Sequence, residues 1–213
     1  MGVGEVSHYS VLVIAPPKTA DIDAYVAQAL SPYSDHNEKP HDCGWAKDNS
    51  AGCDFCWKNS KWDWYVVGGR WAGLLGAYDP TKDPRNYEVC FVCGGTGTRA
   101  GSTYGPEAGW ARTPSAAGHP VIGSGCNGCH GTGWDLRHPP EWVVPPDGNV
   151  RQVAEIPENV TTYGVVLPDG TLVERRISAK YDQMPEAQWR VEWGRTVARY
   201  APDHLGIVVD IHS

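Results

Sequence analysis

Phenylalanine and long apolar runs are scarce in this sequence. Two phenylalanines occur among 213 residues, against ten tryptophans and ten tyrosines. The larger rings carry a polar atom, so they suit half-exposed surfaces and interfaces as well as a core. No apolar run reaches the roughly 18 residues of a membrane-spanning helix, which excludes such a helix. The first residues lack a basic segment, and their apolar run stops at Pro16 and Pro17, so we expect no signal peptide.

Clustered basic charge is absent as well. The formal net charge is −7, and no run of lysine and arginine is longer than Arg175-Arg176. Proteins that contact many phosphates carry a basic stripe, so this composition disfavours nucleic-acid binding. Seven cysteines in a chain without an export signal favour metal binding over disulfides. We therefore expect a protein of the reducing cytoplasm.

Hydrophobic periodicity predicts regular structure at both ends of the chain. Residues 8–15 are β-branched and apolar and read as a buried strand, and residues 19–31 have helical spacing. Residues 161–177 alternate around Pro168-Asp169-Gly170, which predicts a hairpin. A second helix is predicted between Pro185 and Pro202, and a final strand closes the chain.

The order of these elements is strand, helix, strand, strand, helix, strand, which predicts an α+β fold, the ferredoxin-like βαββαβ sandwich. Residues 34–160 would then be a long Gly/Pro-rich, zinc-binding insertion between the first helix and the second strand, since a loop of that length needs something to order it. The predicted division of the chain is a body of residues 1–33 and 161–213, a cysteine-containing loop with a tryptophan-rich segment at 34–87, a zinc-knuckle module at 88–135, and a proline-rich connector at 136–160.

One eight-residue pattern, Cys-x-x-Cys-x-Gly-x-Gly, occurs twice, from Cys90 and from Cys126. Each pattern supplies two thiolates from one tight turn, and its glycines let backbone amides face the sulfur atoms. Tetrahedral structural zinc sites take four such ligands. We predict one all-cysteine zinc site formed by Cys90, Cys93, Cys126 and Cys129. The alternatives are free thiols or a redox disulfide, but the Gly-Gly-Thr-Gly context is unlike a thioredoxin motif.

The paired pattern resembles the cysteine-rich zinc module of J-domain co-chaperones. The resemblance covers about 48 residues and matches the cysteine and glycine positions of both turns. In that family such modules bind zinc and help to handle unfolded clients. This chain has one pair of turns where the family has two, and it lacks the His-Pro-Asp tripeptide. The resemblance therefore implies the zinc geometry and does not imply chaperone activity.

Three further cysteines lie close together in the sequence, at Cys43, Cys53 and Cys56. His41 is our candidate for a fourth ligand, with His36 as an alternative, because sites of three cysteines and one histidine are common. The sequence thus predicts one zinc ion and allows a second. The alternative is a set of reduced surface cysteines.

The two ends of the predicted sheet carry polar residues. The first and last strands of a ferredoxin-like sheet are antiparallel neighbours, which would bring His8 close to His212. Alternation places His8 and Ser10 on the same face as Asp210 and His212, a face we expect the helices to leave open. Such a group could perform acid–base chemistry or bind a metal. Alternatively, these residues are only solvated strand ends.

A tryptophan-rich segment, Trp62-Asp63-Trp64-Tyr65-Val66-Val67-Gly68-Gly69-Arg70-Trp71, is the other unusual feature. Arg70 beside two glycines could approach a phosphate or carboxylate, and a tryptophan could stack on a flat ring. The structural interpretation is a strand with a glycine bend in which Arg70 pairs with Asp63. The weak His-x-Ser similarity to two-histidine phosphoesterases covers only His8–Ser10, and the second copy is missing.

The whole chain resembles a group of uncharacterised proteins common in phages and prophages. The resembling stretches are distributed from end to end: HYSVLVI, SPYSDHNE, KWDWYVVGGRW, YGVVLPDGTLVER and IVVDIHS. The resemblance implies an accessory protein of a phage or mobile element, located in the host cytoplasm. Many relatives lack the turns at 90–129, which implies that the zinc module is an addition to a common body.

Several functions remain open at this point. We favour a zinc-binding protein that binds a host or phage protein, and we favour it over an enzyme because no catalytic motif is complete. The alternatives are a small hydrolase or phosphoesterase, or a pocket that sequesters a small nucleotide. These would use His8, Asp63, Arg70, Asp210 and His212. A last alternative is nucleic-acid binding through the zinc knuckles, which the net charge of −7 disfavours.

Overall fold

The computed structural model describes residues 8–34, 61–98, 126, 128–176 and 183–212. The chain forms two compact units. The sheet unit comprises Met1–Tyr78 and Pro145–Ser213, and the knuckle unit comprises Asp79–Val144. Among the described residues, no helix has the length and apolar character needed to cross a membrane.

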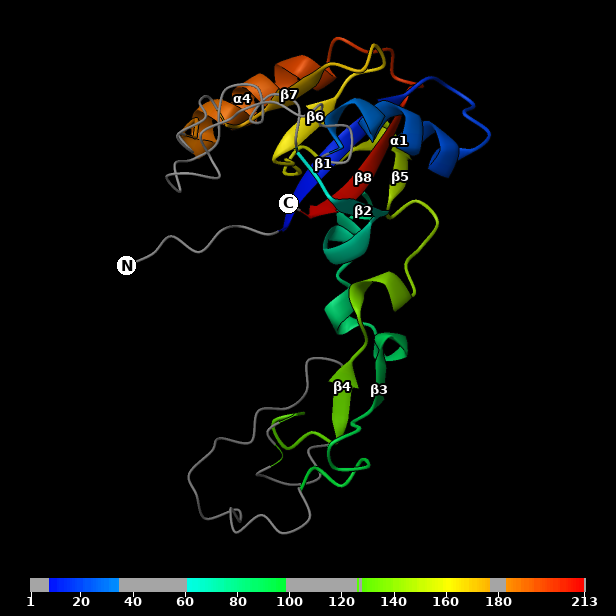
Figure 1. The fold of residues 1–213 in the computed structure, drawn as a ribbon, viewed down its shortest axis with the longest axis vertical. Coiled ribbons are helices and arrows are strands. Elements are labelled where there is room, and N and C mark those ends of the chain that lie inside the picture. The colour runs from blue at the N-terminus through cyan, green and yellow to red at the C-terminus, as the bar shows by residue number, and fades with distance from the viewer. Residues whose placement is uncertain (1–7, 35–60, 99–125, 127, 177–182, 213) are drawn as a thin grey trace, which may run out of the picture. The chain divides into compact units, whose positions relative to one another are not determined.

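A mixed six-stranded sheet is the centre of the sheet unit (Figure 1). Its strands follow the order β2-β8-β1-β6-β7, and β5 also pairs with β8. β8 is antiparallel to β1, β2 and β5, whereas β1 and β6 are parallel. The strands are β1 (His8–Ala15), β2 (Trp64–Val67), β5 (Val150–Gln152), β6 (Gly164–Val166), β7 (Leu172–Glu174) and β8 (Leu205–His212).

Helix α1 (Ile22–Leu30) covers one face of this sheet (Figure 1). The Asp21 side chain caps it by accepting the Ala24 N–H at 2.9 Å, and a capping bond of this kind contributes about 1 kcal/mol. Val26 and Leu30, one helical turn apart, are buried against the odd-numbered residues of β1 and β8. Periodicity thus predicts both the helix and its buried side correctly.

Helix α4 (Glu186–Val197) covers the opposite face. Trp189 and Trp193 pack against the even-numbered residues Leu12, Ile14 and Val208. Both indole N–H groups are satisfied by Thr162, Trp189 by its carbonyl at 2.7 Å and Trp193 by its hydroxyl at 2.9 Å. Two large rings can therefore be buried without an unpaired donor.

The structure confirms the α+β class and the antiparallel pairing of the first and last strands, but it does not confirm the ferredoxin-like topology. That topology would place β7 beside β1, whereas β6 occupies this position. It would also place both helices on one face. Here β2, which the sequence assigned to the insertion, runs parallel to β1 on the far side of β8, so α1 leads toward β2. α4 connects β7 to β8, and it crosses the sheet in the same direction as the connection from β1 to β2. β7 and β8 are parallel to each other but antiparallel to β1 and β2. Because crossovers between parallel strands are right-handed, the two helices lie on opposite faces of the sheet.

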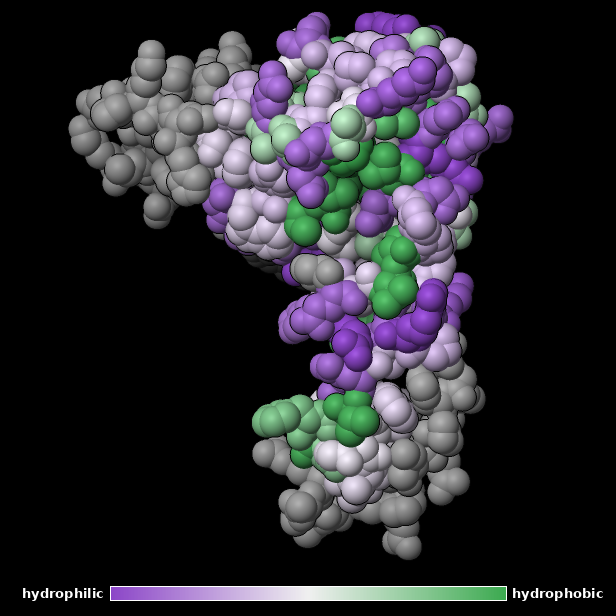
Figure 2. Space-filling model, turned by 90° about the vertical axis from the view of Figure 1, so that its right-hand side faces the viewer, coloured by the Kyte–Doolittle hydropathy of each residue, from purple (hydrophilic) through white to green (hydrophobic). Residues whose placement is uncertain are grey.

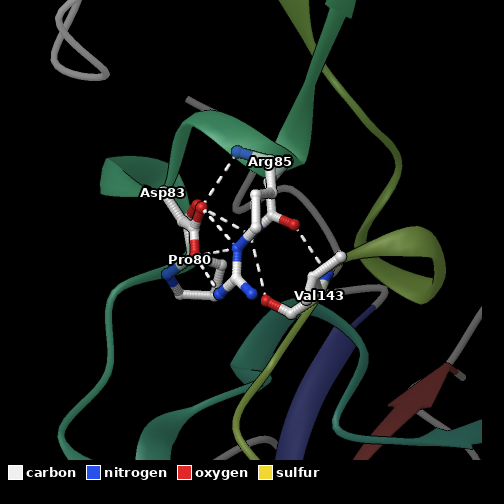
Figure 3. A network of polar contacts seen from close by, with 5 residues as sticks. Pro80, Asp83, Arg85 and Val143 are labelled. Atoms are coloured by element: carbon white, nitrogen blue, oxygen red, sulfur yellow. Dashed lines mark hydrogen bonds and ion pairs between the residues drawn. The ribbon is translucent and has the colours of Figure 1, made fainter.

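The knuckle unit contains the two-stranded sheet of β3 (Tyr87–Val89) and β4 (Trp134–Leu136) and several 3₁₀ turns. Asn86, which directly precedes β3, links two segments of the knuckle unit. Its buried side chain donates to the Pro80 carbonyl at 3.0 Å and accepts the Val143 N–H at 2.6 Å. Next to it, Arg85 forms a two-pronged ion pair with Asp83, with Nε 3.0 Å from both carboxylate oxygens (Figure 3).

Candidate metal centre and histidine cluster

Four sulfur atoms converge in the knuckle unit. The Sγ atoms of Cys90 and Cys126 are 3.8 Å apart, those of Cys93 and Cys129 are 3.7 Å apart, and all four lie within 4.8 Å of one another. Four thiolates at about 2.3 Å around one zinc ion would be about 3.8 Å apart. The four cysteines therefore form a metal site that is compatible with zinc, as the sequence predicted.

The two cysteine turns repeat each other's hydrogen bonds. Gly97 N–H donates to Cys93 Sγ at 3.2 Å, and Gly133 N–H donates to Cys129 Sγ at 3.1 Å. The turns are also linked reciprocally, since Cys90 N–H donates to the Gly133 carbonyl and Cys126 N–H donates to the Gly97 carbonyl. This pseudo-twofold arrangement places both sulfur pairs at one centre.

Left-handed backbone conformations explain the glycines of the pattern. Gly95 and Gly131 both have φ +87°, and Gly97 and Gly133 have φ +71° and +82°. These values carry no steric cost only for glycine, and they turn the amides toward the sulfur atoms. His130, at φ +52°, adopts the same conformation that Gly94 adopts at φ +59° in the first turn.

Burial and hydrogen bonding set the thiol acidities unequally. Burial raises the pKa of the Cys90 thiol and of the Cys129 thiol above the ordinary value. Burial acts in the same direction on Cys93, but the Gly97 N–H and the neighbouring thiols outweigh it and lower the pKa of Cys93 to about 7. Of these three thiols, Cys93 therefore ionises most easily, and the thiolate is the form that binds metal.

The second predicted metal site lies outside the described residues. Its candidate ligands Cys43, Cys53, Cys56 and His41, and the alternative His36, all fall within residues 35–60. That hypothesis stays a prediction.

The sheet register brings the predicted histidines together. His8 pairs directly with His212 across β1 and β8, and their ring centroids are 4.9 Å apart. His8 Nδ1 lies 2.9 Å from Asp210 Oδ1, and His212 Nδ1 lies 2.7 Å from Asp63 Oδ1. Trp64 stacks on the His212 ring at 5.4 Å with planes 10° apart. Each imidazole thus has its own carboxylate partner.

Asp210 is covered by protein, contrary to the open face that we expected. Its residue is 1% exposed, and its second oxygen accepts the Arg70 backbone N–H at 3.0 Å. The cover is the Gly68–Trp71 bend, which packs so closely that a Cβ on Gly69 would lie 2.3 Å from Asp210 Cβ. The glycine pair is therefore required by the approach of this bend to the carboxylate.

The remaining residues of the tryptophan-rich segment have separate roles. Trp62 donates its indole N–H to the Leu30 carbonyl at 3.0 Å, and Trp71 packs against the core under α4. Partial desolvation raises the pKa of the Asp63 carboxyl, but the hydrogen bonds with His212 and with backbone N–H groups outweigh it and lower this pKa below its ordinary value. Arg70 contributes its backbone to the cluster, and its side chain is exposed. The predicted Asp63–Arg70 pairing is thus replaced by Asp63–His212.

Two features were not predicted from the sequence. Lys61 Nζ forms an ion pair with Glu174 Oε1 at 2.6 Å, with side chains only 6% and 11% exposed. Phe91 is 98% exposed although it lies between two cysteines of the metal site. A signal for the second feature was available, because both phenylalanines of the chain, Phe55 and Phe91, lie inside Cys-x-x-Cys sequences.

Comparisons with protein-family models, with curated proteins and with solved structures found no match.

Proposed function

We propose that this protein is a zinc-binding accessory protein of a phage or mobile element that binds a host or phage protein through its knuckle unit. The observation that supports the proposal most is the exposure of Phe91, which is 98% accessible at the tip of a cysteine turn. An apolar ring held outward by a cross-linked turn is an arrangement suited to contact with another protein.

Neighbouring side chains extend this apolar surface. Val89 is 52% exposed and Val92 is 41% exposed. Figure 2 shows apolar side chains gathered on one face of the knuckle unit. Isolated exposed apolar residues are ordinary, whereas a contiguous group points to an interface. Burying one such side chain in a complex would contribute about 1.5–3 kcal/mol.

Zinc would cross-link the two cysteine turns of this unit. The buried hydrophobic cluster found among its described residues consists of Cys90, Cys126 and Cys129, with Cys93 packed against it. A small unit with so little apolar core needs a cross-link or a metal to be stable. When bound, zinc joins two turns that are 36 residues apart in the sequence, and it thereby fixes the position of Phe91.

The biological setting in this proposal rests on sequence resemblance. The stretches HYSVLVI, KWDWYVVGGRW and IVVDIHS resemble phage and prophage proteins, and they lie in or beside β1, β2 and β8 of the sheet unit. In this setting the partner is a bacterial or phage protein in the host cytoplasm.

The test compares two variants of the zinc-loaded chain. Phe91→Ser with Val92→Ser removes the apolar tip. Val191→Ser is the control, because it removes an exposed valine from α4 (53%, against 41% for Val92). The wild-type chain is used to capture binding proteins from a lysate of a prophage-carrying bacterium, and each captured protein is purified. Its affinity for the wild-type chain and for both variants is then measured by calorimetry. We expect binding at least about 10-fold weaker for the double variant only. Equal affinities for all three proteins would refute binding through this surface.

A further inference from the structure

A second site, independent of the zinc site, is formed by the two histidines at the end of the sheet. An ionised carboxylate only accepts hydrogen bonds, so the contacts of Asp210 with His8 and of Asp63 with His212 place a proton on each Nδ1. Nε2 of each neutral ring is then the basic nitrogen. Two oriented bases therefore lie next to each other in an edge-to-face arrangement, with ring centroids 4.9 Å and planes 70° apart.

The two pairs differ in their surroundings. The Asp210 carboxylate is buried and held by His8 and by the Arg70 N–H, whereas the Asp63 side chain is 41% exposed. The His212 side chain is 30% exposed and the His8 side chain is 11% exposed. Different surroundings for two groups of the same kind are typical of an acid–base pair, in which one group donates a proton and the other accepts one.

The neighbours of the pair favour phosphorus chemistry over acyl transfer. Acyl transfer by a histidine–aspartate pair normally uses a hydroxyl nucleophile, but the nearby Ser10 is buried and its Oγ accepts the Tyr163 N–H at 3.3 Å. An in-line displacement at phosphorus by water needs only a base and an acid. The exposed Arg70 offers a cation for a phosphate, and Trp64, 42% exposed, offers a ring for a base.

We propose that His8 and His212 are the acid–base pair of a site that hydrolyses a small nucleotide carrying a 2′,3′-cyclic phosphate. The strained five-membered ring of this phosphodiester opens with acid–base assistance alone. One neutral imidazole takes a proton from water as the water oxygen bonds to phosphorus. The bond from phosphorus to one ribose oxygen breaks, and the other imidazole, protonated, gives its proton to that oxygen. One water is consumed, a phosphomonoester and a hydroxyl are formed, and proton exchange with solvent restores both rings.

The experiment measures hydrolysis of 2′,3′-cyclic AMP by the full zinc-loaded chain. We expect His8→Ala and His212→Ala each to lower kcat/KM by about 100-fold or more, while His138→Ala, an exposed histidine of the knuckle unit, leaves it unchanged. Wild-type protein should give a bell-shaped pH profile. Thermal melting checks that each variant is folded.

Asp63→Asn is a milder variant, because the Asp63 side chain is 41% exposed and its loss should leave the fold intact. It acts through His212, so we expect a lower rate together with a shifted pH profile. Absence of hydrolysis above the buffer rate by folded wild-type protein would overturn the proposal. Equal rates in wild type and both histidine variants would overturn it as well. Neither result bears on the partner-binding test at Phe91, which uses a different unit.

Discussion

The Sγ atoms of Cys93 and Cys129 lie 3.7 Å apart, and each accepts an N–H from the glycine four residues later. This relationship makes the two cysteine turns equivalent halves of one centre. Bringing four ionised thiols so close without a cation would be costly, because like charges at this distance repel strongly. A cation at the centre would offset this repulsion, so the arrangement is compatible with a metal site.

Removal of the metal should loosen the knuckle unit and leave the sheet unit folded. Among its described residues the knuckle unit has a buried cluster of three cysteines with Cys93 packed against it, whereas the sheet unit has two apolar cores. After treatment with a strong chelator, we expect the amides of Cys90 and Cys126 to lose hydrogen-exchange protection and those of Val11 and Val209 to keep it. Unchanged protection of the cysteine amides in metal-free protein would contradict a structural role for the metal.

Breaking the ion pair between Lys61 and Glu174 should be costly. Both side chains are nearly buried, so Glu174→Gln or Lys61→Met leaves one buried charge uncompensated, at a cost of about 3–5 kcal/mol in the free energy of unfolding. Replacing both residues, Lys61→Met with Glu174→Gln, should recover much of the loss because neither charge of the pair remains. Urea unfolding of the three variants measures this. Additive losses in the double variant would show that the two side chains do not act as a pair.

Tyr9 should make the fold sensitive to alkali. Its hydroxyl is buried and donates to the Lys61 carbonyl at 2.5 Å, and burial raises its pKa well above the ordinary 10.0. Below pH 10 both states keep the proton, whereas above it the unfolded chain loses the proton first, so the free energy of unfolding falls as pH rises.

The comparison for this prediction is with Tyr9→Phe, over roughly pH 8–11. Burial lowers the pKa of Lys61, which has the opposite effect on stability, so only the difference between the two proteins isolates the tyrosine. We expect a flatter profile for Tyr9→Phe. Parallel profiles would mean that Tyr9 ionises equally easily in both states.

Gly69→Ala should destabilise the sheet unit through two effects. The backbone at Gly69 has φ +52°, and an added Cβ would lie 2.3 Å from Asp210 Cβ. A strained conformation alone costs about 1–3 kcal/mol, and the contact adds to it. Gly194→Ala in α4 is the control, because a Cβ there meets nothing within 4 Å and alanine should raise stability by about 0.5–1 kcal/mol. Similar melting temperatures for both variants would contradict the close packing of the bend on Asp210.

Local patterns were read from the sequence more reliably than long-range pairings. The cysteine turns were predictable because eight consecutive residues determine each one. The juxtaposition of His8 and His212 was also predictable, since alternation fixes the face of a strand once two strands are known to pair. Lys61 and Glu174 are 113 residues apart, and no periodicity links them.

The sheet order shows the same limit. β2 has four residues and β5 has three. The sequence predicts a strand with a glycine bend at β2, but it places both segments in the insertion because their pattern does not show which strand they pair with. Both pair with β8 and so belong to the central sheet. Because β2 pairs with β8, the chain that follows α1 crosses the sheet toward β2. The direction of this crossing determines the face that α1 covers. Hydrophobic pattern identifies a strand but does not choose its neighbour.

X-ray absorption at the zinc edge tests the central claim most directly. The sample is the zinc-loaded chain with Cys43, Cys53 and Cys56 changed to serine, so that only the four clustered cysteines can supply sulfur. The account predicts one zinc per chain with four sulfur neighbours at about 2.3 Å. A first shell of nitrogen or oxygen atoms, or folded protein that retains no zinc, would contradict it.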